Sequence, residues 1–137
     1  MTRLPDLLLS LLLLLPSTLS APTISVEPAD YYVPLTANVS FMCNYSSTAV
    51  IGVIRIDKED KTATFEAMVR HLVATNTTDW GGVSHDDMVL ESGYPSPAIL
   101  TFLNVTDHHY GKYQCTVIET PSFLQGSVLF YLDIESG

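Results

Sequence analysis

Hydrophobic and polar residues alternate along four stretches of the chain, which is the pattern of strands with one buried face. In each stretch every second residue is apolar or aromatic, and the residues between them are mostly polar. We therefore expect four half-buried strands. Their inward-facing residues are Val39, Phe41 and Cys43; Leu100 and Phe102; Tyr113, Cys115 and Val117; and Val128, Phe130, Leu132 and Ile134.

Shorter apolar runs lie between these stretches and are separated by turn-forming residues. The runs cover 23–26, 50–56, 64–69 and 88–90, and joints such as Gly81-Gly82 divide them. No helical stripe appears after the first twenty residues. Many short strands at this spacing predict an all-β fold, an antiparallel β-sandwich.

The first twenty residues differ from the rest. Arg3 gives a cationic start, residues 7–15 are leucine apart from Ser10, and small residues precede Ala21. These features are typical of a secretory signal peptide. The apolar run is shorter than the ~20 residues that span a bilayer, and a signal anchor is the alternative. The chain is thus expected to divide into a signal peptide, 1–20, and one domain, 21–137.

The chain is acidic, with a net charge of −9, and loss of the signal peptide keeps that charge because Arg3 and Asp6 leave together. Such a surface is unsuited to nucleic-acid phosphates or anionic lipid. No later apolar run is long enough to cross a membrane, and the last residues do not resemble a lipid-anchor signal. We expect a secreted, extracellular protein. An anchor beyond Gly137 in a longer gene product would instead place it at the cell surface.

The mature chain has two cysteines, Cys43 and Cys115. In an oxidising compartment a lone pair is expected to form one disulfide. Closing a loop of about 72 residues contributes roughly 4 kcal/mol in the chain-entropy model. That is a large share of the net stability of a small domain.

The segment from Leu100 to Cys115 carries a motif, L-T-F-L-N-V-T-D-H-H-Y-G-K-Y-Q-C. It resembles the E–F segment of immunoglobulin-superfamily domains, in which an L-x-[IF]-x-x-V strand leads into D-x-G-x-Y-x-C. Tyr113 lies where that family places its tyrosine corner, and Cys43 matches strand B. The separation of the cysteines resembles the variable type. The resemblance implies a variable-type immunoglobulin-like sandwich with extra strands C′ and C″.

Three positions depart from the family pattern. His109 stands in place of the motif's Asp, so the usual ion pair to an Arg on strand D does not carry over. Strand C has no Trp, and we expect Ile54 or Ile56 in that slot, while Trp80 is expected to cover the C″–D region. The last strand has only Gly126 of the F-G-x-G bulge of antigen receptors. The resemblance therefore implies an innate receptor, adhesion module or soluble ligand.

Four N-x-S/T sequons are candidate glycosylation sites. Because Val39 and Cys43 face the core, the Asn before this strand must face outward, and another ends strand E of the same sheet. A third starts the B–C connection, and the fourth lies in the C′–D region. In the order in which they are described above, the sites are Asn38, Asn104, Asn44 and Asn76.

The opposite sheet, made of strands G, F, C and C′, is expected to expose apolar side chains that no sequon covers. A sugar-free apolar patch with a polar rim has the anatomy of a protein-binding surface. The alternative is that the C′ hairpin or the F–G loop covers part of it. The residues expected to contact a partner are Ile51, Val53, Arg55, Lys112, Gln114, Ile118, Leu129 and Tyr131, with Asp57 also at the rim.

The F–G segment, residues 119–125, is a second candidate for contact. Pro121 stiffens it, and Phe123 would form an apolar tip. An exposed aromatic residue on a stiff loop is the kind of residue that supplies binding energy. The alternative is that Phe123 folds back over the end of the core.

No catalytic or cofactor motif occurs, such as G-x-S-x-G, H-E-x-x-H or a Gly-rich phosphate loop. The side chains of His108 and His109 should diverge in a turn, and residues 85–87 are typical of a solvated loop. We expect no enzyme, no cofactor and no metal. The expected function is extracellular protein–protein recognition, with another extracellular protein, an immunoglobulin-family domain or a second copy as partner. The alternatives are a small-ligand carrier or a structural dimer.

Overall fold

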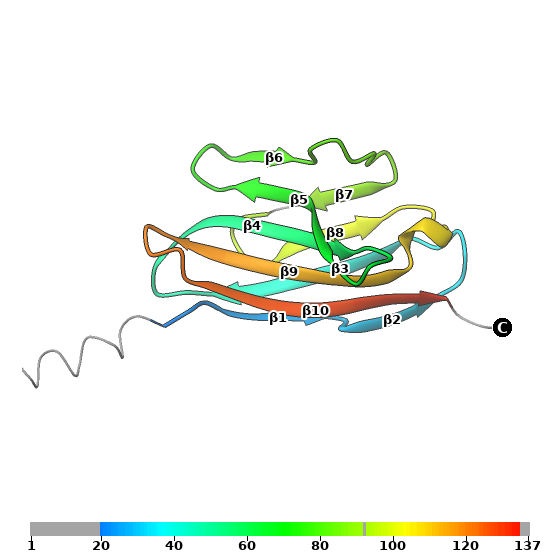
Figure 1. Cartoon of the computed structure of the whole chain (residues 1–137), viewed down its shortest axis with the longest axis horizontal. Coiled ribbons are helices and arrows are strands. Elements are labelled where there is room, and N and C mark those ends of the chain that lie inside the picture. The colour runs from blue at the N-terminus through cyan, green and yellow to red at the C-terminus, as the bar shows by residue number, and fades with distance from the viewer. Residues whose placement is uncertain (1–19, 92, 135–137) are drawn as a thin grey trace, which may run out of the picture.

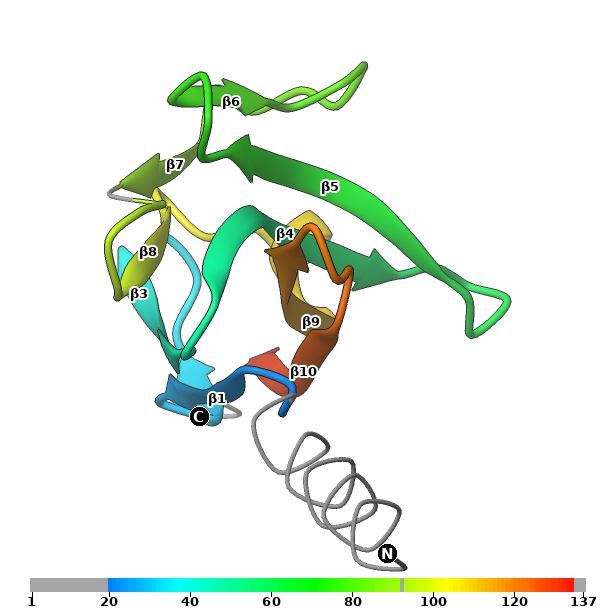
Figure 2. The same ribbon diagram turned by 90° about the vertical axis from the view of Figure 1, so that its left-hand side faces the viewer.

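The computed structural model describes residues 20–91 and 93–134, in which two β-sheets pack face to face (Figure 1). One sheet has the strand order β1-β3-β8-β7, and the other has the order β2-β10-β9-β4-β5-β6. Figure 2 shows the two layers edge-on, with β3 and β8 on one side and β9 and β10 on the other. The strands are β1 (Thr23–Glu27), β2 (Asp30–Val33), β3 (Val39–Ser46), β4 (Val50–Glu59), β5 (Phe65–Leu72), β6 (Thr77–Asp79), β7 (Met88–Glu91), β8 (Ala98–Phe102), β9 (Gly111–Thr120) and β10 (Gln125–Ile134).

The expected all-β sandwich is confirmed. The four alternating stretches form β3, β8, β9 and β10, and all of their expected inward residues but two are buried. Val128 is half-buried and Ile134, at the end of β10, is exposed. The sequence pattern missed β2 and β6, which are short and mostly exposed. Strand β2 runs parallel to β10 and extends the six-stranded sheet.

The expected signal peptide lies outside the described residues, apart from Ser20, and so stays a prediction. Within residues 20–91 and 93–134, no helix has the length and apolar content needed to span a bilayer.

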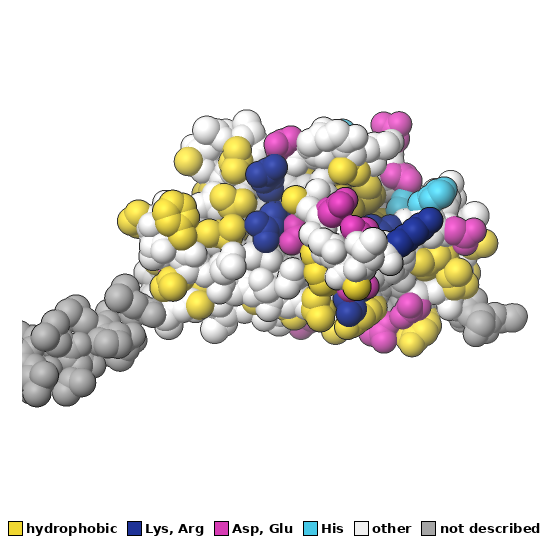
Figure 3. All heavy atoms as spheres, viewed as in Figure 1, with side chains coloured by type: hydrophobic (Ala, Val, Ile, Leu, Met, Phe, Trp, Pro, Cys, Tyr) yellow, Lys and Arg dark blue, Asp and Glu magenta, His cyan; other side chains and the backbone are white. Residues whose placement is uncertain are grey.

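Every lysine and arginine of the described residues lies on the six-stranded sheet or in its β4–β5 turn. Arg55 and Lys58 are on β4, Lys61 is in the turn, Arg70 is on β5 and Lys112 is on β9. Figure 3 shows dark blue side chains at the middle and one end of this face, and yellow hydrophobic ones toward the end where the β9–β10 loop lies. The four-stranded sheet has no lysine or arginine on its strands.

Four aromatic rings from both sheets form the centre of the core. Phe41 of β3 lies 4.7 Å from Phe130 of β10, and Phe102 of β8 lies 5.4 Å from Tyr113 of β9, measured between ring centroids. Tyr113 and Phe130 are stacked at 5.3 Å. Such contacts contribute beyond the area they bury, so the cluster fixes the two sheets against each other.

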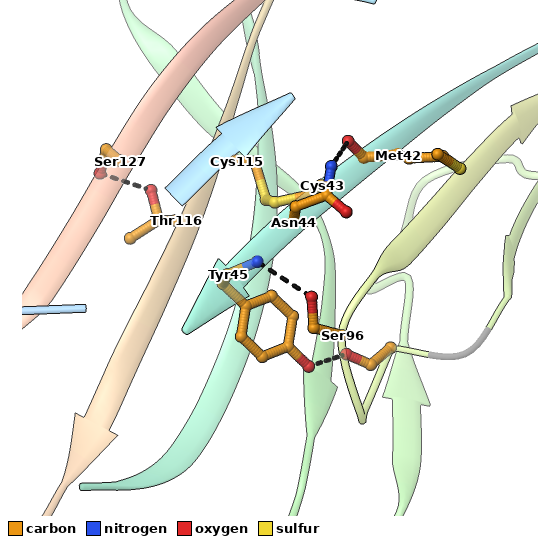
Figure 4. Close-up of a disulfide and its surroundings, with 9 residues drawn as sticks. Met42, Cys43, Asn44, Tyr45, Ser96, Cys115, Thr116 and Ser127 are labelled. Carbon is orange, nitrogen blue, oxygen red and sulfur yellow. Dashed lines mark hydrogen bonds between the residues drawn. A yellow bond between two sulfur atoms is a disulfide. The ribbon is translucent and has the colours of Figure 1, made fainter. Parts of the chain in front are cut away.

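A disulfide joins the sheets beside this cluster, between Cys43 of β3 and Cys115 of β9 (Figure 4). This confirms the expected pairing. On β4, which corresponds to strand C of the family, both Ile54 and Ile56 are buried, so the two together fill the region where the family has Trp. Trp80 packs on the core between β6 and β7 and stacks on His85, as expected for a cover of this region.

The tyrosine corner is also confirmed. The Tyr113 hydroxyl donates a hydrogen bond to the backbone carbonyl of His109, in a short 3-10 helix, η2 (Asp107–His109). The imidazole of His109 is buried, and its Nε2 lies 2.7 Å from Oδ2 of Asp87, just before β7. Its Nδ1 accepts the Thr106 backbone N–H at 2.9 Å, so Nε2 must carry the proton that Asp87 accepts.

A hydrogen bond from the imidazole to a carboxylate therefore takes the place of the family's ion pair, with the acid and the base exchanged between the two elements. The acid comes from the strand D side and the base from the E–F turn, whereas the motif has Arg on strand D and Asp in the turn. His109 thus keeps a polar link between the β7 edge and the β8–β9 connection, because it both accepts from the turn backbone and donates to Asp87.

Candidate protein-binding face

The outward surface of β10, β9, β4 and β5 is called here the GFCC′ face, after the corresponding strands of the family. Residues that are register partners on adjacent strands lie side by side on it. We describe it as rows that cross the strands, starting at the end nearest the β9–β10 loop.

The first row is an apolar strip. Ile118 on β9 is the register partner of Val53 on β4, and Val53 is the partner of Leu72 on β5. Ile118 and Val53 are half-buried, and Leu72 is exposed. The strip thus runs without interruption across three strands. Leu72 was not among the expected residues, although it is apolar and follows the expected run 64–69.

The second row carries two arginines directly opposite each other, Arg55 on β4 and Arg70 on β5. Like charges in this position destabilise a sheet. Arg55 Nε lies 3.0 Å from Asp57 Oδ1, but the two groups are not aligned for a hydrogen bond. Among the described residues, no carboxylate forms an ion pair with Arg70. Asp79 on β6 is the register partner of Arg70 but is not within ion-pair distance of it, so Arg70 is the arginine of this row that has no carboxylate partner among the described residues.

The far end of the face is mixed. Leu129 on β10 is exposed and neighbours Gln114 on β9, which is half-buried. Lys112 Nζ lies 3.5 Å from a Glu59 carboxylate oxygen and 5.8 Å from the centre of the half-buried Tyr131 ring. All of these side chains except Glu59 were expected contacts, and they reach the surface as expected.

One expected contact is wrong. Ile51 is only 7% exposed and belongs to the core cluster. The register with β9 slips between Ile51 and Val53, because Ile51 pairs with Glu119 and Val53 pairs with the preceding residue, Ile118. Gly52 is the extra residue of this bulge, so simple alternation from Val53 back to Ile51 places the latter on the wrong side.

Two polar residues of the same face are buried. Asp57, expected at the rim, is buried beside Arg55. Thr116, which points to this face between Arg55 and Ser127, is buried and shares a hydrogen bond of 2.9 Å with the Ser127 hydroxyl. Neighbouring side chains cover both, so they support the face rather than form its surface.

The β9–β10 loop projects Phe123 into solvent. Its side chain is 76% exposed, which rules out the alternative that it folds back over the core. Val50, at the start of β4, is also exposed and its strand partner Thr120 leads directly into this loop. The loop end therefore extends the apolar strip beyond the edge of the sheet.

The sequons lie mainly on the other sheet. Asn38 and Asn104 are exposed and adjacent, because the Asn38 Oδ1 accepts the Asn104 backbone N–H at 2.8 Å. Asn44 is part of β3 rather than of the following connection, since β3 pairs with β1 up to Ser46. Asn76 is exposed in the β5–β6 turn, close in sequence to Leu72. A sugar there would border the apolar strip at its outer edge.

A partly open groove of about 860 Å³ lies between the β4–β5 turn, the β6–β7 connection and η2. Lys58 enters it, donates to the His108 backbone carbonyl and lies 5.5 Å from the centre of the Tyr113 ring. Burial lowers the pKa of Lys58. No cluster of three or more metal-ligating side chains occurs among the residues that the structure describes.

Comparisons with known proteins establish the fold. No family model matches the sequence, and no curated protein matches it. Murine CRIg superposes with a TM-score of 0.71 and 12% identity, over 85% of this chain and 100% of that one. A chain from the structure that explains T cell specificity and activation by the bacterial superantigen toxic shock syndrome toxin-1 gives a TM-score of 0.72 and 16% identity, over 84% of this chain and 100% of that one.

The chain thus has the variable-type immunoglobulin fold, as the E–F motif indicated. It is an immunoglobulin-like β-sandwich domain in which one disulfide links the two sheets. Likeness at this level of identity defines architecture and leaves the choice of partner to the surface of this chain.

Proposed function

We propose that the chain is an extracellular recognition domain, without enzymatic activity, that binds another protein through the GFCC′ face. The observation that carries the proposal is the strip formed by Ile118, Val53 and Leu72, which is apolar and continuous across β9, β4 and β5. The row of Arg55 and Arg70 borders it on one side with polar groups, as in the rim of protein interfaces. The signal peptide expected at 1–20 would deliver the domain, 21–137, to the extracellular space.

The arginine row indicates the charge of the partner. Arg55 and Arg70 face each other, and a carboxylate placed between them would offset their repulsion. Arginine also pairs with carboxylates in a bidentate geometry, which suits it to this role. We therefore expect an acidic protein surface as the partner, whether on an immunoglobulin-family domain, another ectodomain or a second copy of this chain.

Glycosylation supports the same choice of face. Carbohydrate at Asn38, Asn44 and Asn104 would cover the four-stranded sheet and leave the GFCC′ face open. Asn76, if occupied, would limit access only from the β5–β6 edge. Occupancy of each sequon is tested by peptide mass spectrometry of the secreted protein.

The test uses the glycosylated protein, secreted from animal cells and multimerised, against an array of purified ectodomains that includes its own. Val53→Arg and Tyr131→Arg change the GFCC′ face. Val89→Arg is the matched control, because Val89 is similarly exposed on β7 of the opposite sheet. We expect wild type and the Val89→Arg variant to capture the same partner, and the two face variants to lose it, with capture weakening as salt rises.

Two outcomes would contradict the proposed function. If both face variants are secreted normally and every captured partner is unchanged, another surface binds. If the wild-type protein captures no ectodomain, including its own, the proposed function is wrong.

A further inference from the structure

The β9–β10 loop rests on a buried carboxylate that the fold alone does not require. Along β9 the inward residues are Tyr113, Cys115, Val117 and then Glu119, which is only 2% exposed. Burial of a carboxylate is costly unless hydrogen bonds satisfy it. No lysine, arginine or histidine forms an ion pair with Glu119 in the described parts of the chain.

Two serine hydroxyls satisfy this carboxylate, and they come from two different loops. The Ser47 hydroxyl, in the β3–β4 connection, donates to Oε2, and the Ser122 hydroxyl, in the β9–β10 loop, donates to Oε1 at 3.2 Å. Each serine oxygen in turn accepts a backbone N–H of its own loop, from Ala49 at 3.0 Å and from Leu124 at 3.3 Å. Glu119 therefore ties the two loops to each other.

The backbone of Glu119 closes the same loop. Its N–H donates to the Leu124 carbonyl at 2.8 Å, and its carbonyl accepts the Phe123 N–H at 3.1 Å. Side chain and backbone together thus fix residues 122–124 from the single position 119. A loop held this way binds without a large loss of conformational freedom.

Phe123 is held in an unfavourable state by these contacts. Its φ is +60°, in the left-handed region that an aromatic residue rarely adopts. Its ring is also the most exposed large apolar side chain among the described residues. Glycine would fit this backbone without strain, so the choice of Phe serves something other than stability. Strain of this kind concentrates at functional sites.

We propose that Glu119 is a positioning residue that holds the β9–β10 loop ready, so that the Phe123 ring inserts into an apolar pocket on a protein partner. This inference rests on the proposed function and assigns its aromatic anchor. The exposed Val50 lies at the same end and would contact the rim of that pocket. Residues 119–125 and 47–50 contain no lysine or arginine, which disfavours insertion into an anionic membrane.

The first test needs no partner. Glu119→Met keeps the volume of the side chain, removes both acceptors and leaves an apolar core. We expect its thermal midpoint to equal or exceed that of wild type, while amide hydrogen exchange at Phe123 and Leu124 becomes at least tenfold faster. Asp60→Ala is the control, because Asp60 accepts the Thr62 and Thr64 amides of the β4–β5 turn and should speed exchange there alone.

A second variant separates strain from packing. Phe123→Gly should equal or exceed wild type in its thermal midpoint, since it relieves the positive φ and removes no buried contact. A lower midpoint for Phe123→Gly, or unchanged exchange at Phe123 and Leu124 in Glu119→Met, would overturn the proposal.

Binding to the partner found in the array completes the test. Phe123→Ala should weaken capture at least thirtyfold, and Tyr32→Ala, a change at another exposed aromatic residue, should not. If Val53→Arg abolishes capture but Phe123→Ala does not, Phe123 is not the anchor, whereas the proposal that the GFCC′ face binds the partner is supported. If no ectodomain is captured, both proposals are overturned. Vesicles of phosphatidylcholine, with or without phosphatidylserine, test the alternative of a membrane. If they bind wild type but not Phe123→Ala, Phe123 inserts into a membrane and the proposal of a protein pocket is overturned.

Discussion

Exchange of the acid and the base at the link between Asp87 and His109 should restore the arrangement found in the family motif. In the double variant His109→Asp with Asp87→Arg, the acid returns to the turn and the base to the strand D side. The aspartate that replaces His109 can still accept the Thr106 backbone N–H, which the imidazole Nδ1 accepts now. Each single variant, by contrast, brings like charges together or leaves donors facing each other.

The magnitudes follow from the observed geometry. Two unit charges about 4 Å apart interact by roughly 4 kcal/mol at an effective dielectric constant of 20. The His109 side chain is 5% exposed but that of Asp87 is 46% exposed, so solvent screens the interaction. We take about 2 kcal/mol for the repulsion in His109→Asp. Loss of the hydrogen bond to Asp87 adds about 1 kcal/mol, for a total near 3 kcal/mol, and Asp87→Arg alone should cost about 2 kcal/mol.

The assay is urea unfolding followed by the fluorescence of Trp80, the single tryptophan of the chain. We expect the double variant to lose about 2 kcal/mol less than the sum of the two single losses. The matched control pairs His109→Asp with Asp86→Arg, because Asp86 is exposed and the imidazole is hydrogen-bonded to Asp87 instead. If the losses add in the double variant, or if Asp86→Arg rescues equally, the reversed pair is not a specific link.

Three further predictions concern acids and the bulge. Burial, and after it the neighbouring Asp30, raises the pKa of Asp133. A carboxyl group whose pKa is raised by folding destabilises the fold once it ionises. Asp133→Asn should therefore be more stable than wild type at pH 7 and lose that advantage below about pH 4. Hydrogen bonds from Thr62 and Thr64 lower the pKa of Asp60. The stabilisation that they give is present above the ordinary pKa of the carboxyl group and is lost as the pH falls through the lowered value. Asp60→Ala should therefore lower the urea midpoint at pH 7 and match wild type near pH 2. Ile51→Asp should cost at least about 3 kcal/mol and Val53→Asp less than about 1 kcal/mol in urea unfolding, and similar losses would contradict the bulge at Gly52.

The sequence predicted the fold because the residues that define it follow local rules. Strands β3, β8, β9 and β10 alternate strictly, and the pairing of Cys43 with Cys115 had no competitor. Strands β2 and β6 have only four and three residues, too few for a period-2 pattern, and only their pairing with β10 and β5 makes them strands. Tertiary context supplied what periodicity lacked.

The candidate face was predicted in part, for a physical reason. Period-2 reasoning placed Val53 and Ile118 correctly and failed at Ile51, since a single inserted glycine reverses the side from which residues project. The same rule applied two residues beyond Val117 would have placed Glu119 inside. It was missed because charged residues are expected at the surface. The partnership of Asp87 with His109 joins residues 22 positions apart, and no local pattern reports it.

The confinement of cationic side chains to one sheet has a practical consequence for measuring affinity. All three lysines, Lys58, Lys61 and Lys112, belong to the sheet that carries the GFCC′ face or to its turn. Amine-directed biotin, dyes and sensor-chip chemistry that react with lysine will therefore attach beside the surface to be tested and can block binding there. Immobilisation through a peptide tag after Gly137 avoids this chemistry and leaves that surface free to bind.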